Sequence, residues 1–161
     1  MADGEGQCDV PQVSAVLSGS QNHRILVVED DEDSGDMLRF LLELCGHDVR
    51  LARCGAEGLA MAASWRPDIV ISDLGLPNEL DGYALARALR SNPLHRAAFL
   101  VALSGMGRDC DKSLALAAGF DFYLPKPVDL DALEAAVARA AQDPDGEGRG
   151  YQLSDWRAPR A

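Results

Sequence analysis

Residues 68–77 read Asp-Ile-Val-Ile-Ser-Asp-Leu-Gly-Leu-Pro, and this stretch decides the fold of the chain. Its apolar, β-branched run is typical of a strand that is buried on both faces, as in a parallel sheet. Asp73 ends that run, and glycine and proline break the chain just after it. In open α/β sheets, ligands bind at the carboxyl ends of the strands, where we expect Asp73. A single Asp there also fits a turn, so its role depends on the rest of the chain.

Apolar runs alternate with helical patterns along the chain. The sequence predicts strands at 24–28, 49–52, 69–72, 98–103 and 120–124, and helices at 34–45, 56–63, 83–90, 109–118 and 130–141. Short connections between such elements predict a parallel sheet with helices on both faces. The expected fold class is therefore α/β, a doubly wound (βα)5 arrangement with a five-stranded parallel sheet.

The two ends of the chain differ in composition from its centre. Residues 1–22 contain three acidic residues and no basic residue, with several Gly, Ser and Gln, which predicts a flexible leader. Residues 142–161 are rich in Pro, Gly and charge, which predicts a tail; a docking segment anchored by Trp156 is the alternative. The folded domain is expected over 23–141.

Charge and composition argue against several classes of protein. The chain has 26 acidic and 15 basic residues, and its net charge of −11 disfavours binding to nucleic acid. No apolar run is long enough to cross a membrane, and the first 20 residues lack the regions of a secretory signal. The four cysteines show no C-x-x-C spacing, which disfavours structural zinc and predicts reduced thiols in a cytoplasmic protein.

Polar side chains stand directly after four of the expected strands. They are Glu29 and Asp30 after the first strand, Asp73 after the third, Ser104 after the fourth and Lys126 after the fifth. Three crowded carboxylates repel one another, and Mg²⁺ with its hard oxygen ligands would relieve that repulsion. Lysine and hydroxyl donors beside a carboxylate suit phosphoryl transfer to that carboxylate. Each residue alone also fits a structural role, as a cap, a turn residue or an exposed charge.

Five motifs, in order along 23–141, resemble the signatures of response-regulator receiver domains. They are Ile25-Leu26-Val27-Val28-Glu29-Asp30, Asp73-Leu74-Gly75-Leu76-Pro77, Asp81-Gly82, Ala102-Leu103-Ser104-Gly105 and Tyr123-Leu124-Pro125-Lys126-Pro127. The resemblance implies a flavodoxin-like sheet of order 2-1-3-4-5. It also implies a signalling phosphoacceptor of a two-component system or phosphorelay, not an enzyme with an external substrate.

The same resemblance implies a role for each motif residue. Asp73 would accept a phosphoryl group from a phosphohistidine on a histidine kinase or a histidine phosphotransfer protein. The implied Mg²⁺ ligands are Glu29 (directly or through water), Asp30, Asp73 and the backbone carbonyl of Gly75. Ser104 and Lys126 would bind the phosphoryl oxygens, and the Lys126–Pro127 peptide bond is expected to be cis.

A switch is implied as well. Ser104 would move toward the phosphoryl group, and Tyr123 would turn into the space that Ser104 leaves. The surface formed by 109–118, 120–124 and 130–141 would then change its preference for a downstream protein, as a population shift. No DNA-binding output domain is expected; the chain fits a freestanding receiver or the receiver of a hybrid histidine kinase.

Two features bear on the lifetime of the phosphoryl group and on its recognition. Gly75 and Met106 stand two positions after Asp73 and Ser104, where family members often carry side chains that orient the hydrolytic water. Neither residue suits that task, which predicts slow self-dephosphorylation. The stretch 78–80 is one residue longer than is usual in the family, so we expect a bulged loop with the chemistry retained.

Two other classes of function compare poorly with the motifs. A haloacid-dehalogenase-like phosphatase places its nucleophile after the first strand in an Asp-x-Asp pair, and Asp73-Leu74-Gly75 lacks the second Asp. A pseudo-receiver that only binds proteins normally lacks one of Asp73, Ser104 and Lys126, and all three are present.

Overall fold

Strands and helices alternate along the chain as its apolar pattern predicts. The computed structural model describes residues 22–105 and 109–142. The strands are β1 (Arg24–Val28), β2 (Asp48–Ala52), β3 (Ile69–Asp73), β4 (Phe99–Ser104) and β5 (Phe122–Pro125). The helices are α1 (Glu32–Leu44), α2 (Gly55–Trp65), α3 (Gly82–Ser91), α4 (Asp109–Ala118) and α5 (Leu130–Gln142).

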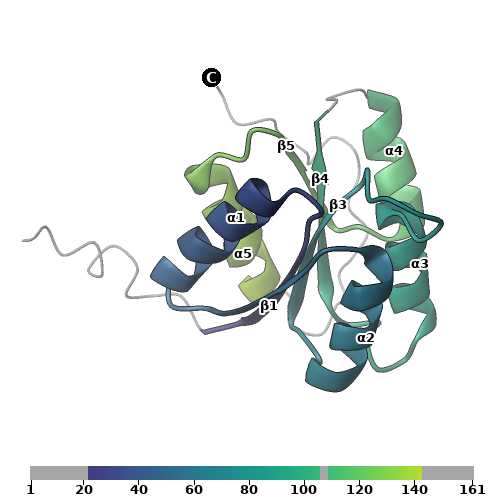
Figure 1. The fold of residues 1–161 in the computed structure, drawn as a ribbon, viewed down its shortest axis with the longest axis horizontal. Helices are drawn as coiled ribbons and strands as arrows, with labels where there is room; N and C mark the ends of the chain where they lie inside the picture. Colours follow the sequence, from purple (N-terminus) through teal and green to yellow (C-terminus); the bar gives the residue numbers. More distant parts are fainter. Residues whose placement is uncertain (1–21, 106–108, 143–161) are drawn as a thin grey trace, which may run out of the picture.

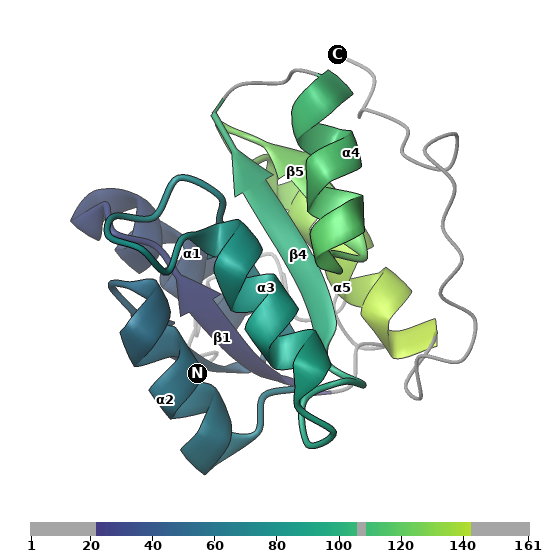
Figure 2. The same ribbon diagram turned by 90° about the vertical axis from the view of Figure 1, so that its right-hand side faces the viewer.

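The strands form one sheet in the order β2-β1-β3-β4-β5, and every neighbouring pair within the described ranges is parallel. Helices α1 and α5 cover one face of this sheet, and α2, α3 and α4 cover the other (Figures 1 and 2). The predicted fold class and strand order are confirmed. All strands therefore direct their carboxyl ends to one edge of the sheet.

Strand residues alternate between two apolar cores, one on each face of the sheet. On β1, Leu26 and Val28 pack toward α2, whereas Ile25 and Val27 pack toward α1 and α5. All four of these side chains are 0% exposed. Burial on both faces explains why β1 and β3 read as continuous apolar runs.

Carboxylate caps begin two helices at the carboxyl edge of the sheet. Asp31 accepts a hydrogen bond from the backbone N–H of Ser34 at 3.1 Å and caps α1. Asp81 accepts one from the N–H of Ala84 at 2.9 Å and caps α3. Because side-chain caps fix where a helix begins, both helices start beside the residues that follow β1 and β3.

Several local expectations differ from the structure, among them the bounds of some elements. Strand β5 begins two residues later than predicted, because the N–H of Phe120 still bonds to the carbonyl of Ala115 as part of the end of α4. Met37 and Leu130 belong to the apolar helix patterns, yet they are 58% and 40% exposed. The sheet buries only a narrow stripe of each helix, so both side chains lie at its margin.

Several expectations fall outside the described ranges. These are the flexible leader, most of the tail with Trp156, and the role of Met106. Across 22–105 and 109–142, no helix combines the length and apolar character that crossing a membrane requires.

The hydrogen bond between His23 and His47 is expected to be sensitive to acid. It lies at the amino edge of the sheet, opposite the carboxyl ends of the strands. Its side chain is 7% exposed, and its Nδ1 accepts a hydrogen bond from the backbone N–H of His23 at 3.2 Å. Burial lowers the pKa of His47, and the stacked ring of His23 lowers this pKa further.

Because the folded-state pKa of His47 lies below its unfolded value of about 6.5, the unfolded chain binds the proton more readily. The free energy of unfolding is therefore expected to fall as the pH drops below that value. In His47→Asn, a neutral acceptor replaces Nδ1, and the fall should be shallower when urea denaturation is repeated from neutral to mildly acidic pH. If the free energy of unfolding depends equally on pH in the parent and in the variant, His47 is not the residue responsible.

Candidate functional site

Lys126, directly after β5, joins carboxylates from two other strands. Its Nζ donates to Oε2 of Glu29 at 2.8 Å and to Oδ2 of Asp73 at 2.9 Å. Glu29 follows β1 and Asp73 ends β3, so the parallel order of the strands brings the three residues together. The Lys126–Pro127 peptide bond is cis, as expected.

The buried setting perturbs two of these charges. Glu29 has no exposed side-chain surface, and burial raises its pKa against the opposing hydrogen bonds from Lys126 and the Asp31 N–H. Burial acts to lower the pKa of Lys126, but its hydrogen bonds to Glu29 and Asp73 outweigh burial and raise that pKa. Lys126 therefore remains a fixed positive charge at neutral pH.

Three carboxylates at this edge could hold a metal ion. Oxygen atoms of Glu29, Asp30 and Asp73 lie within 4.8 Å of one another. Glu29 is buried, Asp73 is half-buried and Asp30 is exposed, so the cluster opens to solvent through Asp30. A set of hard oxygen ligands with an open side fits Mg²⁺, which keeps several of its waters.

This cluster predicts that Mg²⁺ stabilises the fold. Thermal unfolding should occur at a higher temperature with Mg²⁺ present, because an ion that binds only the folded state stabilises that state, by about 1.4 kcal/mol at ten times its Kd. Asp30→Asn should remove most of this shift, whereas Asp68→Asn, at the amino edge of the sheet, should retain it. An Mg²⁺ response that is the same in all three proteins would exclude the cluster as its cause.

The backbone around Asp73 is tightly held. The Gly75 N–H donates to Oδ1 of Asp73 at 3.0 Å, and the Leu74 N–H donates to the carbonyl of Leu103 at 3.0 Å. Gly82 lies against the same segment: a Cβ on it would come within 2.3 Å of the Asp73 carbonyl oxygen and 2.7 Å of the Leu74 Cα. Glycine at position 82 is thus a condition for the observed position of Asp73.

Ser104 and Tyr123 lie on the two strands beyond β3. Asp73 pairs with Leu103 in the register of β3 with β4, so the next residue, Ser104, lies at the same edge of the sheet. The Lys126 N–H donates to the Ser104 carbonyl at 2.8 Å, which ties the end of β4 to the end of β5. Both side chains are buried, Ser104 at 6% and Tyr123 at 5% exposure.

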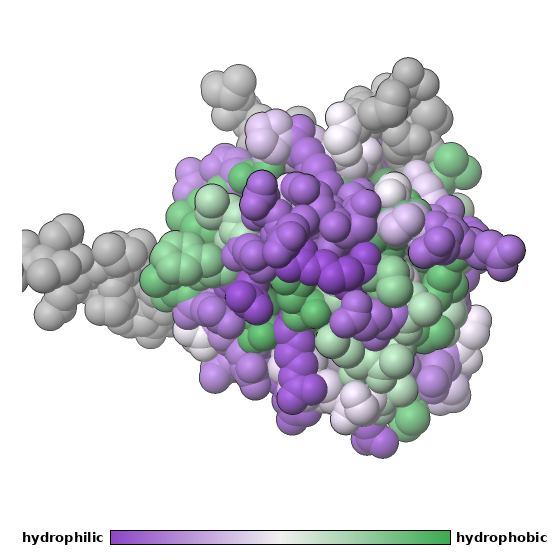
Figure 3. Space-filling model, viewed as in Figure 1, coloured by the Kyte–Doolittle hydropathy of each residue, from purple (hydrophilic) through white to green (hydrophobic). Residues whose placement is uncertain are grey.

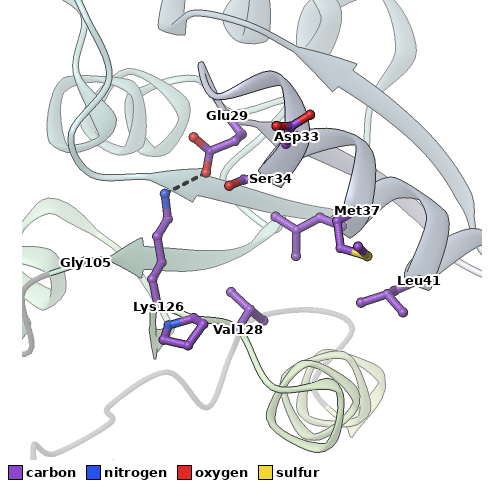
Figure 4. A pocket seen from close by; sticks show the side chains of 10 residues that line it. Glu29, Asp33, Ser34, Met37, Leu41, Gly105, Lys126 and Val128 are labelled. Carbon is purple, nitrogen blue, oxygen red and sulfur yellow. Dashed lines mark hydrogen bonds and ion pairs between the residues drawn. The ribbon is translucent and has the colours of Figure 1, made fainter.

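A pocket of about 600 Å³ opens beside Lys126, between α1 and the segment that links β5 to α5 (Figure 4). Its polar end is formed by Glu29, Ser34 and Lys126, and its apolar wall by Met37, Leu41 and Val128, as the close-up shows. The polar end thus includes Lys126, whose Nζ contacts Asp73. A pocket with a polar end and an apolar wall suits a ligand that presents both polar and apolar groups.

The longer loop after Asp73 folds against α2. Asn78 has a positive φ of 72°, and the Leu80 carbonyl lies 2.1 Å from the point where a Cβ on Gly55 would stand. This close approach, like that at Gly82, could not be derived from sequence reasoning. The only signal was the glycine at each position, and glycines have many other uses.

Comparison with known proteins places these residues in context. The family model described as "Response regulator receiver domain" matches residues 25–138. The response regulator MprA of Mycolicibacterium vanbaalenii is 39% identical over 134 residues, which cover 81% of this chain and 57% of that protein. The DNA-binding dual master transcriptional regulator RpaA of Synechocystis is 34% identical over 114 residues, which cover 71% of this chain and 47% of that protein. The chain thus spans about half the length of these two relatives.

A solved structure is similar as well. The receiver domain of the sensor histidine kinase PA1611 from Pseudomonas aeruginosa has a magnesium ion coordinated in its active site cleft. It superposes with a TM-score of 0.70 at 29% identity, over 76% of this chain and 99% of that one.

Proposed function

The chain belongs to the response-regulator receiver family, and on that premise we propose that Asp73 accepts a phosphoryl group from a phosphohistidine on a partner protein. The observation that supports the proposal is that Nζ of Lys126 donates hydrogen bonds to both Asp73 and Glu29. A cation fixed at a nucleophilic carboxylate is what a charged phosphoryl donor requires, because like charges would otherwise repel.

The transfer is a displacement at phosphorus. An Asp73 carboxylate oxygen forms the new O–P bond as the N–P bond to the partner's imidazole breaks, and that imidazole takes up a proton. Nζ of Lys126 donates to a phosphoryl oxygen, and Oγ of Ser104 is proposed to donate to another. Mg²⁺, held by Glu29, Asp30, Asp73 and the Gly75 carbonyl, would offset the negative charge of the phosphoryl group.

The pocket supports a protein as the phosphoryl donor. Its apolar wall continues along α1, where Met37, Phe40 and Leu44 are 58%, 57% and 61% exposed. These three positions follow the i, i+3, i+7 spacing of one helix face. Figure 3 shows apolar side chains over α1, beside the polar surface at the centre of the view. A histidine kinase or histidine phosphotransfer protein could cover such a face, whereas a small phosphate ester could not.

The output of the domain is proposed to be a change in protein binding on the surface of α4, β5 and α5. A net charge of −11 supports a protein as the partner over nucleic acid. RpaA is named a DNA-binding regulator and PA1611 a sensor histidine kinase, so receivers of this kind occur in both settings. The proposal holds in either setting, and a cytoplasmic location accords with the free thiols of Cys45 and Cys54.

Incubation with acetyl phosphate and Mg²⁺, followed by intact-mass measurement, tests the proposed function. The expected result is the gain of one phosphoryl group that persists on the chain. Continuous release of phosphate without a stable adduct would indicate a phosphatase, and no change in mass would indicate a receiver that only binds proteins.

Gly75 predicts a long-lived phosphoryl group. A Cβ at this position would find only the Asp73 carboxylate, at 3.8 Å, so a side chain fits beside the phosphorylated residue without displacing the backbone. We expect Gly75→Asn to shorten the phosphoryl half-life severalfold, because its amide can orient a hydrolytic water. Phosphate release after removal of acetyl phosphate measures both lifetimes. A parent half-life of seconds would contradict the prediction.

A further inference from the structure

A second pocket, of about 440 Å³, opens at the amino edge of the sheet. Its walls come from residues that directly precede β1, β3 and β4, namely His23, Asp68 and Ala98, and from Ala140 and Ala141 in the last turn of α5. A volume of this size is in the range of pockets that accommodate a ligand or several side chains. The strands run away from this edge, so the pocket is separate from the carboxylate cluster at their carboxyl ends.

The pocket combines an exposed apolar side chain with a buried polar atom that lacks a partner. Leu94, which lines it, is 58% exposed. Nε2 of His23, which also lines it, is buried and has no hydrogen-bond partner within 22–105 and 109–142. Because buried polar atoms are normally hydrogen-bonded, an occupant with an apolar surface and an N–H donor would suit this pocket. The indole ring of tryptophan has both.

The chain leaves the described part of the fold at this pocket. Helix α5 ends at Gln142, directly after the two alanines that line the pocket. The next residues are Asp143-Pro144-Asp145-Gly146, and a Pro-Asp-Gly sequence favours a β-turn, which would direct the chain back over the amino edge. Trp156 follows, and an extended chain adds about 3.3 Å per residue, so the intervening residues are long enough to reach the pocket.

The charges of this segment and of the pocket are complementary. Residues 143–148 contain three acidic residues and no basic residue. At the pocket, Arg66 and the neighbouring Arg96 are exposed, and neither forms an ion pair with any residue that the structure describes. Asp68 has the opposite charge, but its Oδ2 already accepts a hydrogen bond from the backbone N–H of Arg24 at 2.9 Å. An acidic segment is therefore the one that unpaired arginine side chains would attract.

We propose that residues 143–161 fold back over the amino edge of the sheet and place Trp156 in this pocket, against Leu94 and His23. The acidic residues that precede Trp156 then lie beside Arg66. Docking at this edge leaves Asp73 uncovered at the opposite edge, so the inference does not depend on the proposed phosphoryl transfer.

Labelling of the full chain with fluorotryptophan tests the docking, because the chain contains two tryptophans and gives two ¹⁹F signals. Trp156→Phe identifies the Trp156 signal by its loss, and the Trp65 signal reports whether each variant is folded. We expect the Trp156 signal to shift severalfold less between H₂O and D₂O than it does in the urea-unfolded chain. A Trp156 signal that is as sensitive to the solvent as in urea would overturn the proposal.

Substitutions in the pocket show whether Trp156 is shielded at this site. Leu94→Ser should raise the solvent sensitivity of Trp156 toward its value in urea, whereas Leu114→Ser, at a leucine on α4 that is 56% exposed, should leave it unchanged. Arg66→Asn should act in the same direction as Leu94→Ser. Arg66 has a φ of 53°, which asparagine tolerates, so this variant removes the charge and retains the backbone. A shielded Trp156 that responds to neither pocket variant would place the segment elsewhere and overturn the proposal.

Dilution identifies the chain from which the docked segment comes. Within one chain, the solvent sensitivity of Trp156 should be independent of protein concentration. A sensitivity that rises on dilution would mean that Trp156 docks on a second copy, which would contradict docking within one chain.

Discussion

Asp73→Asn is expected to abolish the gain of phosphoryl mass from acetyl phosphate while the chain stays folded. A carboxamide is a poor nucleophile, so the O–P bond cannot form at this position. The fold should persist, because Lys126 keeps its 2.8 Å hydrogen bond to Glu29 and one of three clustered acidic groups becomes neutral. Intact mass and circular dichroism on the same sample give both readouts.

Asp48→Asn is the matched control for this change. Asp48 is exposed at the amino end of β2, so the substitution also removes one negative charge but leaves the carboxyl edge of the sheet untouched. This control should accept phosphate as the parent does. Incorporation by Asp73→Asn at the parental level would mean that another carboxylate is the acceptor.

Gly82→Ala is expected to lower both stability and phosphate acceptance. Helix propensity alone would favour alanine by about 1 kcal/mol at this first position of α3. The added Cβ, however, would come within 2.3 Å of the Asp73 carbonyl oxygen and 2.7 Å of the Leu74 Cα, which are backbone atoms. Overpacking costs about 1–3 kcal/mol or more, and the backbone has little freedom to yield, so we expect a net loss of about 2 kcal/mol.

Urea denaturation measures this loss, and the same sample is tested for Mg²⁺ binding. A displaced Asp73 should weaken Mg²⁺ binding at concentrations of urea where the variant is still folded. Gly105→Ala serves as the control for stability, because a Cβ there meets nothing within 4 Å. A Gly82→Ala chain more stable than the parent would show that propensity outweighs the close approach.

The strands were predictable because strands buried on both faces, such as β1, β3 and β4, have continuous apolar sequences. Their order followed from the resemblance to receiver domains. The helices could be predicted from the periodic spacing of their apolar residues. Their first and last residues were harder to predict, because a cap or a closing hydrogen bond decides where a helix ends. Exposure was harder to predict: Met37 fits the apolar pattern of α1, yet only the width of the sheet shows that it faces solvent.

The identities of the candidate site residues could be predicted from the sequence, but their contacts could not. Residues at or just after the carboxyl ends of strands, such as Asp73 and Lys126, could be identified because parallel topology brings these ends together. Their contacts could not: Lys126 and Glu29 are 97 residues apart, and only the folded register shows that one ammonium group serves both carboxylates. Close approaches at Gly55 and Gly82 depend on a missing Cβ, which no sequence pattern distinguishes from other glycines.

The most direct measurement is the location of the phosphoryl group on the chain. After incubation with acetyl phosphate and Mg²⁺, borohydride reduces an aspartyl phosphate to homoserine, and tandem mass spectrometry of peptides identifies the altered residue. The account predicts homoserine at position 73 and at no other acidic position. Homoserine at position 30, or an unaltered Asp73 in a chain that has gained phosphoryl mass, would contradict it.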